Sequence, residues 1–154
     1  MNHMRNPRMF NAAFHLIQSC IHNKEYEDAS VYAHQAYEMV LKDADGIIPS
    51  DQREELLARG SYWLARATFR LAHAGGIPAG EKQKAGEDAI AFARQALEID
   101  TQLYGTEHSD VAGDMTTLAT VLDYFNNVDD DEVLRLHEQA NAIESRLAGS
   151  SSDK

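Results

Sequence analysis

Histidine and carboxylate side chains, which act as metal ligands and proton carriers in many proteins, are frequent in this chain of 154 residues. The sequence holds 7 histidines and 25 aspartates and glutamates. His15 and His22 lie on one side of an expected helix, but about 10 Å apart along its axis, which is too far for both to bind one zinc ion. This spacing does not predict a metal site, and we expect no cofactor.

The segment VDDDEVLRLH, which begins at Val128, places four acidic residues next to one another. It lacks the alternating ligands and the glycine of a calcium-binding loop. Acidic residues at the beginning of a helix are stabilised by the helix dipole. We therefore interpret the run as a helix N-terminus, with a contact to a basic partner as the alternative.

Nucleophilic catalysis has few candidate residues in this sequence. His108 lies between carboxylates in TEHSD, but no serine or cysteine is placed by the sequence to be activated by it. The one cysteine, Cys20, falls on an apolar helical stripe, where it acts as a small apolar residue. The segment GGIPAG lacks the lysine and the serine or threonine of a phosphate-binding loop. We therefore predict that the protein is not an enzyme.

A stripe of arginines and aromatic residues in RGSYWLARATFR does predict binding. Helical spacing brings six side chains onto one continuous face, and these are Arg59, Tyr62, Trp63, Arg66, Phe69 and Arg70. Arginine binds carboxylates through two parallel hydrogen bonds, and aromatic side chains supply buried area. The stripe suits an extended peptide that carries carboxylates and a large apolar side chain.

A second interpretation of the same stripe stays open. Aromatic side chains at helical spacing commonly pack between helices, and arginines pair readily with nearby carboxylates. In that case the six residues hold the fold together and bind no partner.

Composition limits the classes of partner. The formal net charge is −11 and the pI is about 4.9, so neither nucleic-acid phosphates nor an anionic membrane surface attracts the chain as a whole. A single cysteine cannot form an internal disulfide, and no apolar run approaches the roughly 20 residues of a membrane-spanning helix. We expect a cytoplasmic protein with no nucleic-acid and no membrane partner.

The abundance of alanine, leucine, glutamate and glutamine, together with only 3 prolines, predicts an all-α protein with one domain. Three segments align with one another without gaps: EDASVYAHQAYEMV, EDAIAFARQALEID and DEVLRLHEQANAIE. In each of them small residues recur at spacings of four and three, which keeps one helical face thin. Each segment follows another helix-like run, so the repeating unit is a helical hairpin.

The repeats divide the chain into three hairpins between two ends. A loop between Ala72 and Gly86 explains why the first two segments begin further apart than the last two. Residues 1–8 are expected to be flexible or a remnant of cloning, and residues 149–154 to be a disordered tail. The hairpins are expected at about 9–43, 51–104 and 110–148.

Turn residues mark the expected helix ends. Gly105 stands where a helix C-terminus favours a left-handed residue. Ser109 or Asp110 is expected to cap the helix that follows, and Ser50 or Asp51 to cap the helix that contains the stripe.

The segment QALEIDTQLYGTEHSDVAGDMTTLATVLDYF resembles the tetratricopeptide repeat in its long, kinesin-light-chain-like form. That form ends one helix with Ala-Leu-x-Ile and continues through a Gly-x-x-His-x-x-Val-Ala linker, and these elements stand here at Ala96, Leu97, Ile99, Gly105, His108, Val111 and Ala112. The sequence has Ser109 where the family usually has proline, and Thr117 where a groove asparagine is common. The resemblance covers residues 9–148 and implies a right-handed α-solenoid of three antiparallel hairpins.

The resemblance also implies a binding surface, because arrays of this type hold acidic, tryptophan-containing peptides on a concave face. The first helix of each hairpin lines that face. The hairpins on either side of the stripe add further candidate residues, which are Asn11, Phe14, His15, Gln18, Thr116, Thr117, Thr120, Asp123 and Tyr124. The expected function is that of a non-catalytic adaptor or scaffold that binds a peptide segment of a partner protein.

Self-association is the alternative function. Three hairpins are close to the minimum for a stable array, and neither end has an evidently polar capping helix. The last helix carries more apolar residues than one buried face requires, namely Val133, Leu134, Leu136 and Ile143. We therefore expect that a homo-oligomer, if one forms, does so through this helix.

Overall fold

The structure, a computed structural model, describes residues 7–43, 46, 48–126 and 130–152. This part of the chain is helical and contains no strand, which confirms the all-α prediction. Its six α-helices are α1 (Pro7–His22), α2 (Tyr26–Leu41), α3 (Ser50–His73), α4 (Lys82–Tyr104), α5 (Ser109–Val121) and α6 (Asp130–Ser152). A short 3-10 helix, η2 (Ala79–Glu81), precedes α4, and a π-helical turn, η3 (Leu122–Asn126), follows α5.

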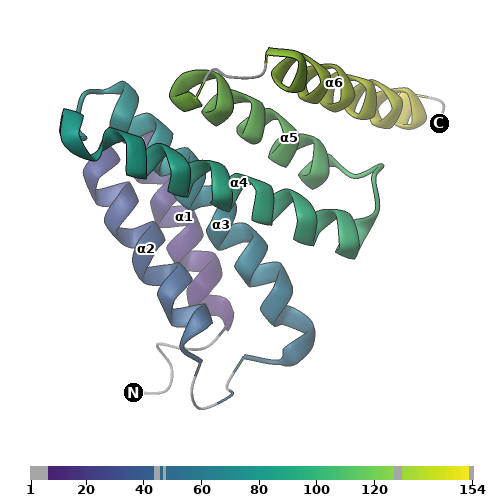
Figure 1. Ribbon diagram of the computed structural model, residues 1–154. Coiled ribbons are helices and arrows are strands. Elements are labelled where there is room, and N and C mark those ends of the chain that lie inside the picture. The colour runs from purple at the N-terminus through teal and green to yellow at the C-terminus, as the bar shows by residue number, and fades with distance from the viewer. Residues whose placement is uncertain (1–6, 44–45, 47, 127–129, 153–154) are drawn as a thin grey trace.

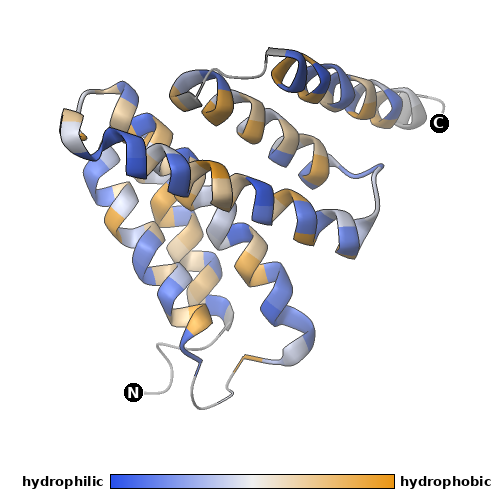
Figure 2. Ribbon diagram, in the orientation of Figure 1, coloured by the Kyte–Doolittle hydropathy of each residue, from blue (hydrophilic) through white to orange (hydrophobic). Residues whose placement is uncertain are grey.

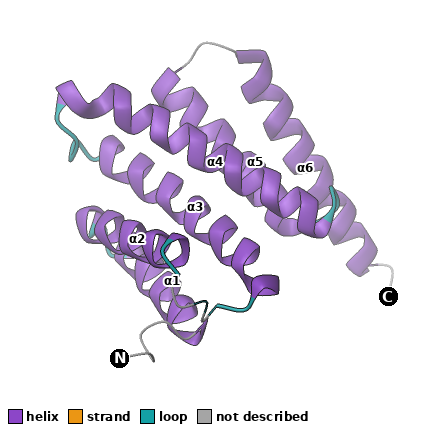
Figure 3. Cartoon of the chain, turned by 60° about the horizontal axis from the view of Figure 1, so that its bottom comes forward, coloured by secondary structure: helices purple, strands orange, loops and turns teal. Residues whose placement is uncertain are grey.

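Each helix packs against the next one in the chain (Figure 1). In addition, α1 contacts α3, and α3 contacts α5. The odd-numbered helices are therefore in contact from one end of the molecule to the other, with α3 in the middle (Figure 3). None of the described helices has the length and apolar character needed to cross a membrane.

Small residues allow the helices to approach closely. The repeated alanines of the first two aligned segments are all buried, at most 3% exposed, and they are Ala29, Ala33, Ala36, Ala89, Ala93 and Ala96. The third segment follows the pattern less strictly, since Val133 and His137 are half-buried and Ala140 is buried. Apolar positions recur along every helix (Figure 2), as amphipathic packing requires.

A buried polar contact fixes α3 between its two neighbours. The amide nitrogen of Gln95, on α4, lies 2.9 Å from the hydroxyl of Tyr37 on α2 and 2.9 Å from that of Ser61 on α3. Ser61 is fully buried, so an unpaired hydroxyl there would be destabilising. One side chain thus ties three helices together.

The buried face of α1 differs from the expected one. The helical period predicts a core stripe of Ala13, Leu16, Ile17 and Cys20, but Leu16 is 46% exposed. Phe10 and Phe14 are 1% and 4% exposed and fill the core together with Ile17. These three residues are spaced by four and three, so they lie on one face of α1. The helix is rotated about its axis so that this face, with its two phenylalanines, is buried, because this removes the larger apolar area from water.

The helices α1 and α3 end in the same way. In each, the last turn closes with two backbone hydrogen bonds around a residue of positive φ, the Schellman arrangement. That residue is Gly75 after α3, with φ 80°, and Lys24 after α1, with φ 64°. A lysine thus occupies a position that favours glycine.

Two of the expected helix caps are wrong. Ser50 and Asp51 lie inside α3, which begins after Pro49 without a side-chain cap. The α5 helix is capped by His108, whose Nδ1 accepts a hydrogen bond from the amide of Asp110 at 3.1 Å. The chain reaches His108 in an extended conformation, and this brings the imidazole to the free amides.

The expected loop and tail are shorter than the sequence suggested. The loop between Ala72 and Gly86 is reduced because α3 continues to His73 and α4 already begins at Lys82. The α6 helix runs through residues 149–152, which we expected in the tail. Residues 1–6, expected to be flexible or a remnant of cloning, and residues 153–154, expected in the tail, lie outside the described part of the chain. Gly105 ends α4 with φ 80°, as predicted.

Replacing Gly86 with alanine should destabilise the fold. A Cβ atom at this position would lie 2.8 Å from the Cβ and Cγ atoms of Phe125, so α4 and η3 would have to separate. We expect the free energy of unfolding, measured by urea denaturation, to fall by about 1–3 kcal/mol.

The matched control is Gly113→Ala, because this glycine also lies inside a helix and a Cβ there meets no atom within 4 Å. Its free energy of unfolding should rise by about 0.5–1 kcal/mol, because alanine has a higher helix propensity than glycine. Equal changes in the two variants would contradict the close approach at Gly86.

Candidate functional site

The six residues of the predicted stripe, hereafter the α3 stripe, lie along the side of α3 that faces α1 and α5. Arg59 and Arg70 are exposed, and the other four are half-buried. Trp63 packs against the core formed by α1, α2 and α3, and Phe69 against the core formed with α4 and α5. The aromatic side chains therefore contribute to helix packing while part of each remains accessible.

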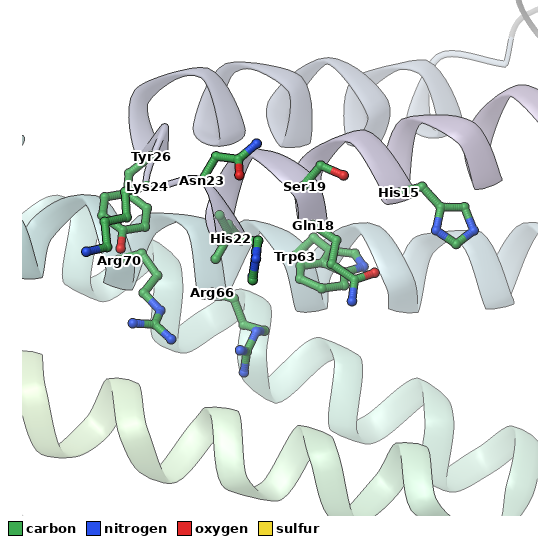
Figure 4. Close-up of a pocket in the computed structure, with 11 residues that line it drawn as sticks. His15, Gln18, Ser19, His22, Asn23, Lys24, Tyr26, Trp63, Arg66 and Arg70 are labelled. Carbon is green, nitrogen blue, oxygen red and sulfur yellow. The ribbon is translucent and has the colours of Figure 1, made fainter.

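A cavity of about 650 Å³ lies between α1 and α3, and we name it the basic cavity. The turn after α1 contributes Lys24, and the α3 stripe contributes Trp63, Arg66 and Arg70. Figure 4 shows the two guanidinium groups extending in the same direction from α3. The α1 wall includes His15, Gln18 and His22, and none of the residues that line this cavity is a carboxylate.

The cations of the basic cavity lack acidic partners. Among the described residues, none forms a salt bridge with Lys24, Arg66 or Arg70. The Nε atom of Arg66 is buried without a hydrogen-bond partner, and its guanidinium carbon lies 5.4 Å from the ring centre of Tyr62 and 5.8 Å from that of Trp63. Arg66 is therefore held by aromatic contacts, and its guanidinium keeps hydrogen-bonding capacity for a ligand.

A smaller cavity of about 140 Å³, the α3–α5 slot, lies on the other side of the same arginines. Arg66, Phe69 and Arg70 form its α3 wall, and Thr117 and Thr120 belong to its α5 wall. The hydroxyl of Thr117 is buried with no hydrogen-bond partner. The slot is thus partly apolar and offers one unsatisfied hydroxyl.

Three residues expected on the binding face have structural contacts instead. Phe14 is buried in the core, under the guanidinium of Arg59 at 5.5 Å. Asn11 accepts a hydrogen bond from that guanidinium. Tyr124 donates to the carbonyl of Ala72 at 3.1 Å, which satisfies the C-terminal end of α3.

Two further candidates lie at the edge of the face. Thr116 is exposed and donates to the carbonyl of Ala112 at 3.2 Å within its own helix. Asp123 is exposed as well.

The sequence analysis missed a buried pair of carboxyl groups. Asp100, near the end of α4, is 7% exposed, and Asp114, on α5, is 2% exposed. Their side chains share a hydrogen bond. The signal was present in the sequence, because Asp114 falls between Val111 and Leu118 on the buried face of its helix.

Burial is the main cause of the unusual acidity of this pair. Desolvation raises the pKa of Asp114 to about 10, with further contributions from the hydrogen bond and from the negative charges of Asp100 and Asp110. Desolvation also raises the pKa of Asp100. At neutral pH the pair therefore keeps one proton between its two carboxyl groups.

The last helix uses most of its apolar residues for packing. Leu136 and Ile143 are 7% and 3% exposed, and Val133 is half-buried against the same core, whereas Leu134 is 57% exposed. The expectation of an apolar surplus on this helix is therefore reduced to Leu134.

The acidic run at the beginning of α6 makes a contact within the chain. Glu132 accepts two hydrogen bonds from Arg94, at 2.9 and 3.1 Å. Residues 127–129, which include part of the run, lie outside the described residues. In the described part of the chain, no group of three or more histidine, cysteine and acidic side chains is arranged to hold a metal ion.

Comparison of the chain with protein-family models, with curated proteins and with solved structures finds no match.

Replacing Asp114 with asparagine should make stability less dependent on pH. The pKa of Asp114 is raised in the folded state to about 10, so between about pH 4 and pH 10 the unfolded chain releases a proton that the folded protein keeps. The free energy of unfolding therefore falls as the pH rises through this window. Asparagine cannot ionise in either state and removes this loss.

We expect Asp114→Asn to be more stable than the unmodified protein at pH 8 by about 2 kcal/mol, and to show much less gain at pH 5, in urea denaturation. Asp123→Asn, at an exposed site, is the control. Parallel pH profiles for Asp114→Asn and the unmodified protein would contradict the protonated pair.

Proposed function

We propose that this protein is a non-catalytic adaptor that binds an extended, acidic peptide segment with an aromatic residue. The peptide lies across the face formed by α1, α3 and α5, with the α3 stripe at its centre. We further propose that the three helix pairs form a right-handed solenoid of the tetratricopeptide type.

The contacts among the odd-numbered helices support this architecture. The chain alternates between helices that meet in series, α1 with α3 and α3 with α5, and helices that pack behind them. In stacked helical hairpins, the first helices of the pairs form one continuous wall. The basic cavity and the α3–α5 slot both open between members of this wall.

One observation carries the functional proposal: in a chain of net charge −11, the cations beside the basic cavity form no salt bridge with any carboxylate of the described residues. With 25 acidic residues available, unpaired arginines on one face are an unexpected arrangement for a fold that uses them only for stability. A ligand that brings its own carboxylates satisfies them through paired hydrogen bonds.

The turn after α1 supports the same conclusion. Lys24 has a positive φ, which is unfavourable for a residue with a side chain, although the equivalent turn after α3 uses Gly75. Strain at one position is commonly retained where the side chain serves a function. Here it places an ammonium group at the edge of the basic cavity.

The neighbouring slot supplies the apolar part of the site. Arg66 and Arg70 line both the basic cavity and the α3–α5 slot, so carboxylates bound on one side lie next to the ring of Phe69 on the other. A peptide with acidic residues next to an aromatic one matches both surfaces. Self-association through α6 has less support, because Leu134 is the main apolar residue left exposed there.

Arg66→Gln should weaken peptide binding with little effect on the fold. The probe is a fluorescein-labelled decapeptide with glutamates around one tryptophan, and its binding is followed by fluorescence anisotropy. Loss of a paired hydrogen bond to a carboxylate predicts an affinity about 10- to 150-fold lower, corresponding to roughly 1.5–3 kcal/mol.

The matched control is Arg135→Gln, because Arg135 is exposed on α6, outside the residues lining the basic cavity. It should bind the probe as the unmodified protein does. If Arg66→Gln and Arg135→Gln bind equally well, or if a peptide with lysines in place of the glutamates binds equally tightly, the proposal is wrong.

Lys24→Gly should change stability and binding in opposite directions. Glycine relieves the positive φ and should raise the free energy of unfolding by about 0.5–1 kcal/mol. The same change removes one cation from the cavity edge and should lower the affinity for the acidic decapeptide several-fold, most clearly at low salt. A variant that is more stable and binds the peptide unchanged would remove Lys24 from the site.

A further inference from the structure

A second cavity adjoins the α3 stripe, at the end away from Arg70. It encloses about 290 Å³ between the first half of α3, the end of α4 and the beginning of α5, and we name it the acidic cavity. Trp63 lines both this cavity and the basic cavity. A ligand bound in the basic cavity therefore lies directly beside the acidic cavity.

The charged groups of the acidic cavity are mainly carboxyls. Glu55 and Asp110 are exposed at its edge, and the buried Asp100 and Asp114 lie in its wall. The one cationic side chain among its lining residues, Arg59, donates to Asn11. The cavity thus has the opposite charge to the basic cavity beside it.

An unsatisfied atom within this wall points to a ligand. Asp114 is 98% buried, and its Oδ2 atom has no hydrogen-bond donor among the described residues. A buried acceptor without a donor is destabilising unless something supplies the donor. A group with several N–H donors on a compact cation, such as an ammonium, satisfies it.

Aromatic rings complete the cavity. Tyr62 and Trp63 meet edge to face at 5.0 Å, and Tyr104 lines the opposite part of the wall, where it stacks on His108 at 4.3 Å. Aromatic faces attract organic cations, most strongly when water is excluded. Because the described chain has no group of three or more ligands arranged for a metal, the cavity fits an organic cation better than a metal ion.

We propose that the acidic cavity binds the ammonium group of a lysine side chain carried by the same peptide whose acidic residues occupy the basic cavity. This inference rests on the proposed function, and it extends the expected ligand to a segment with a lysine next to its acidic stretch.

Binding in this position changes the protonation of the pair. The free protein keeps one proton on the pair of Asp100 and Asp114, and the other charged groups that line the cavity are Asp110 and, on α3, Glu55 and Arg59. An ammonium next to Asp114 favours its ionised form. The exchange is balanced: the ammonium enters with its charge, the carboxyl becomes a carboxylate, and one proton goes to the solvent.

The first experiment uses butylammonium chloride as the probe, at constant ionic strength. Trp63 is the one tryptophan of the chain, so its indole N–H signal in a nitrogen-15 NMR spectrum is unambiguous. We expect a weak, saturable shift of this signal. Asp114→Asn should weaken the interaction at least about tenfold, while Asp28→Asn, at an exposed site on α2, should leave it unchanged.

Three results of this titration would overturn the assignment. They are the absence of a saturable shift, the same affinity in Asp114→Asn, and a response to calcium chloride in place of butylammonium.

Calorimetry adds a separate test, because proton release makes the measured enthalpy depend on the ionisation enthalpy of the buffer. Peptide binding without that dependence would place the ammonium away from Asp114.

The second experiment compares the acidic decapeptide carrying one lysine with the same peptide carrying norleucine. The lysine form should bind about tenfold more tightly. This advantage should disappear in Asp114→Asn and persist in Arg66→Gln. An equal affinity of the two peptides would overturn the inference. If butylammonium binds while both peptides fail to bind, the proposed function is wrong and the cation site stands.

Discussion

The close approach of α3 to its neighbours determines the rest of this structure. Ala58, Ser61 and Ala65 are fully buried, so α2 and α4 can lie directly against α3. Gln95 fixes this arrangement through hydrogen bonds to α2 and α3. The α3 stripe occupies another part of the circumference of the same helix, so its position follows from the packing of α3 against α2 and α4.

Charge is distributed unevenly over this scaffold. Several arginines have ordinary structural contacts: Arg53 donates to the carbonyl of Val40 at 2.8 Å, and Arg94 and Arg146 bind carboxylates on other segments. Arg66 and Arg70, on the α3 stripe, do not pair in this way among the described residues. The basic cavity and the buried acidic pair both lie beside α3, so this face carries both signs of charge within the length of one helix. Such an arrangement favours one orientation of a bound ligand.

The sequence predicted those features that depend on local periodicity. The helices, the alanine faces and the alignment of the six residues of the α3 stripe follow from spacing alone. Features that depend on how side chains pack against one another could not be predicted from spacing. An example is the rotation of α1, which buries Phe14 and exposes Leu16.

Features that depend on contacts between distant segments were also missed. The pairing of Asp100 with Asp114 needs α4 and α5 to be placed first, and the positive φ of Lys24 depends on how α1 turns into α2.

Peptide binding at the α3 stripe is tested most directly by the NMR shift of the Trp63 indole signal when the acidic decapeptide is added. If the peptide lies across the α3 stripe, the shift is saturable and Arg66→Gln weakens the binding that it reports. If the peptide binds but shifts signals of α2 or α6 and leaves the Trp63 signal in place, the peptide does not bind at the α3 stripe.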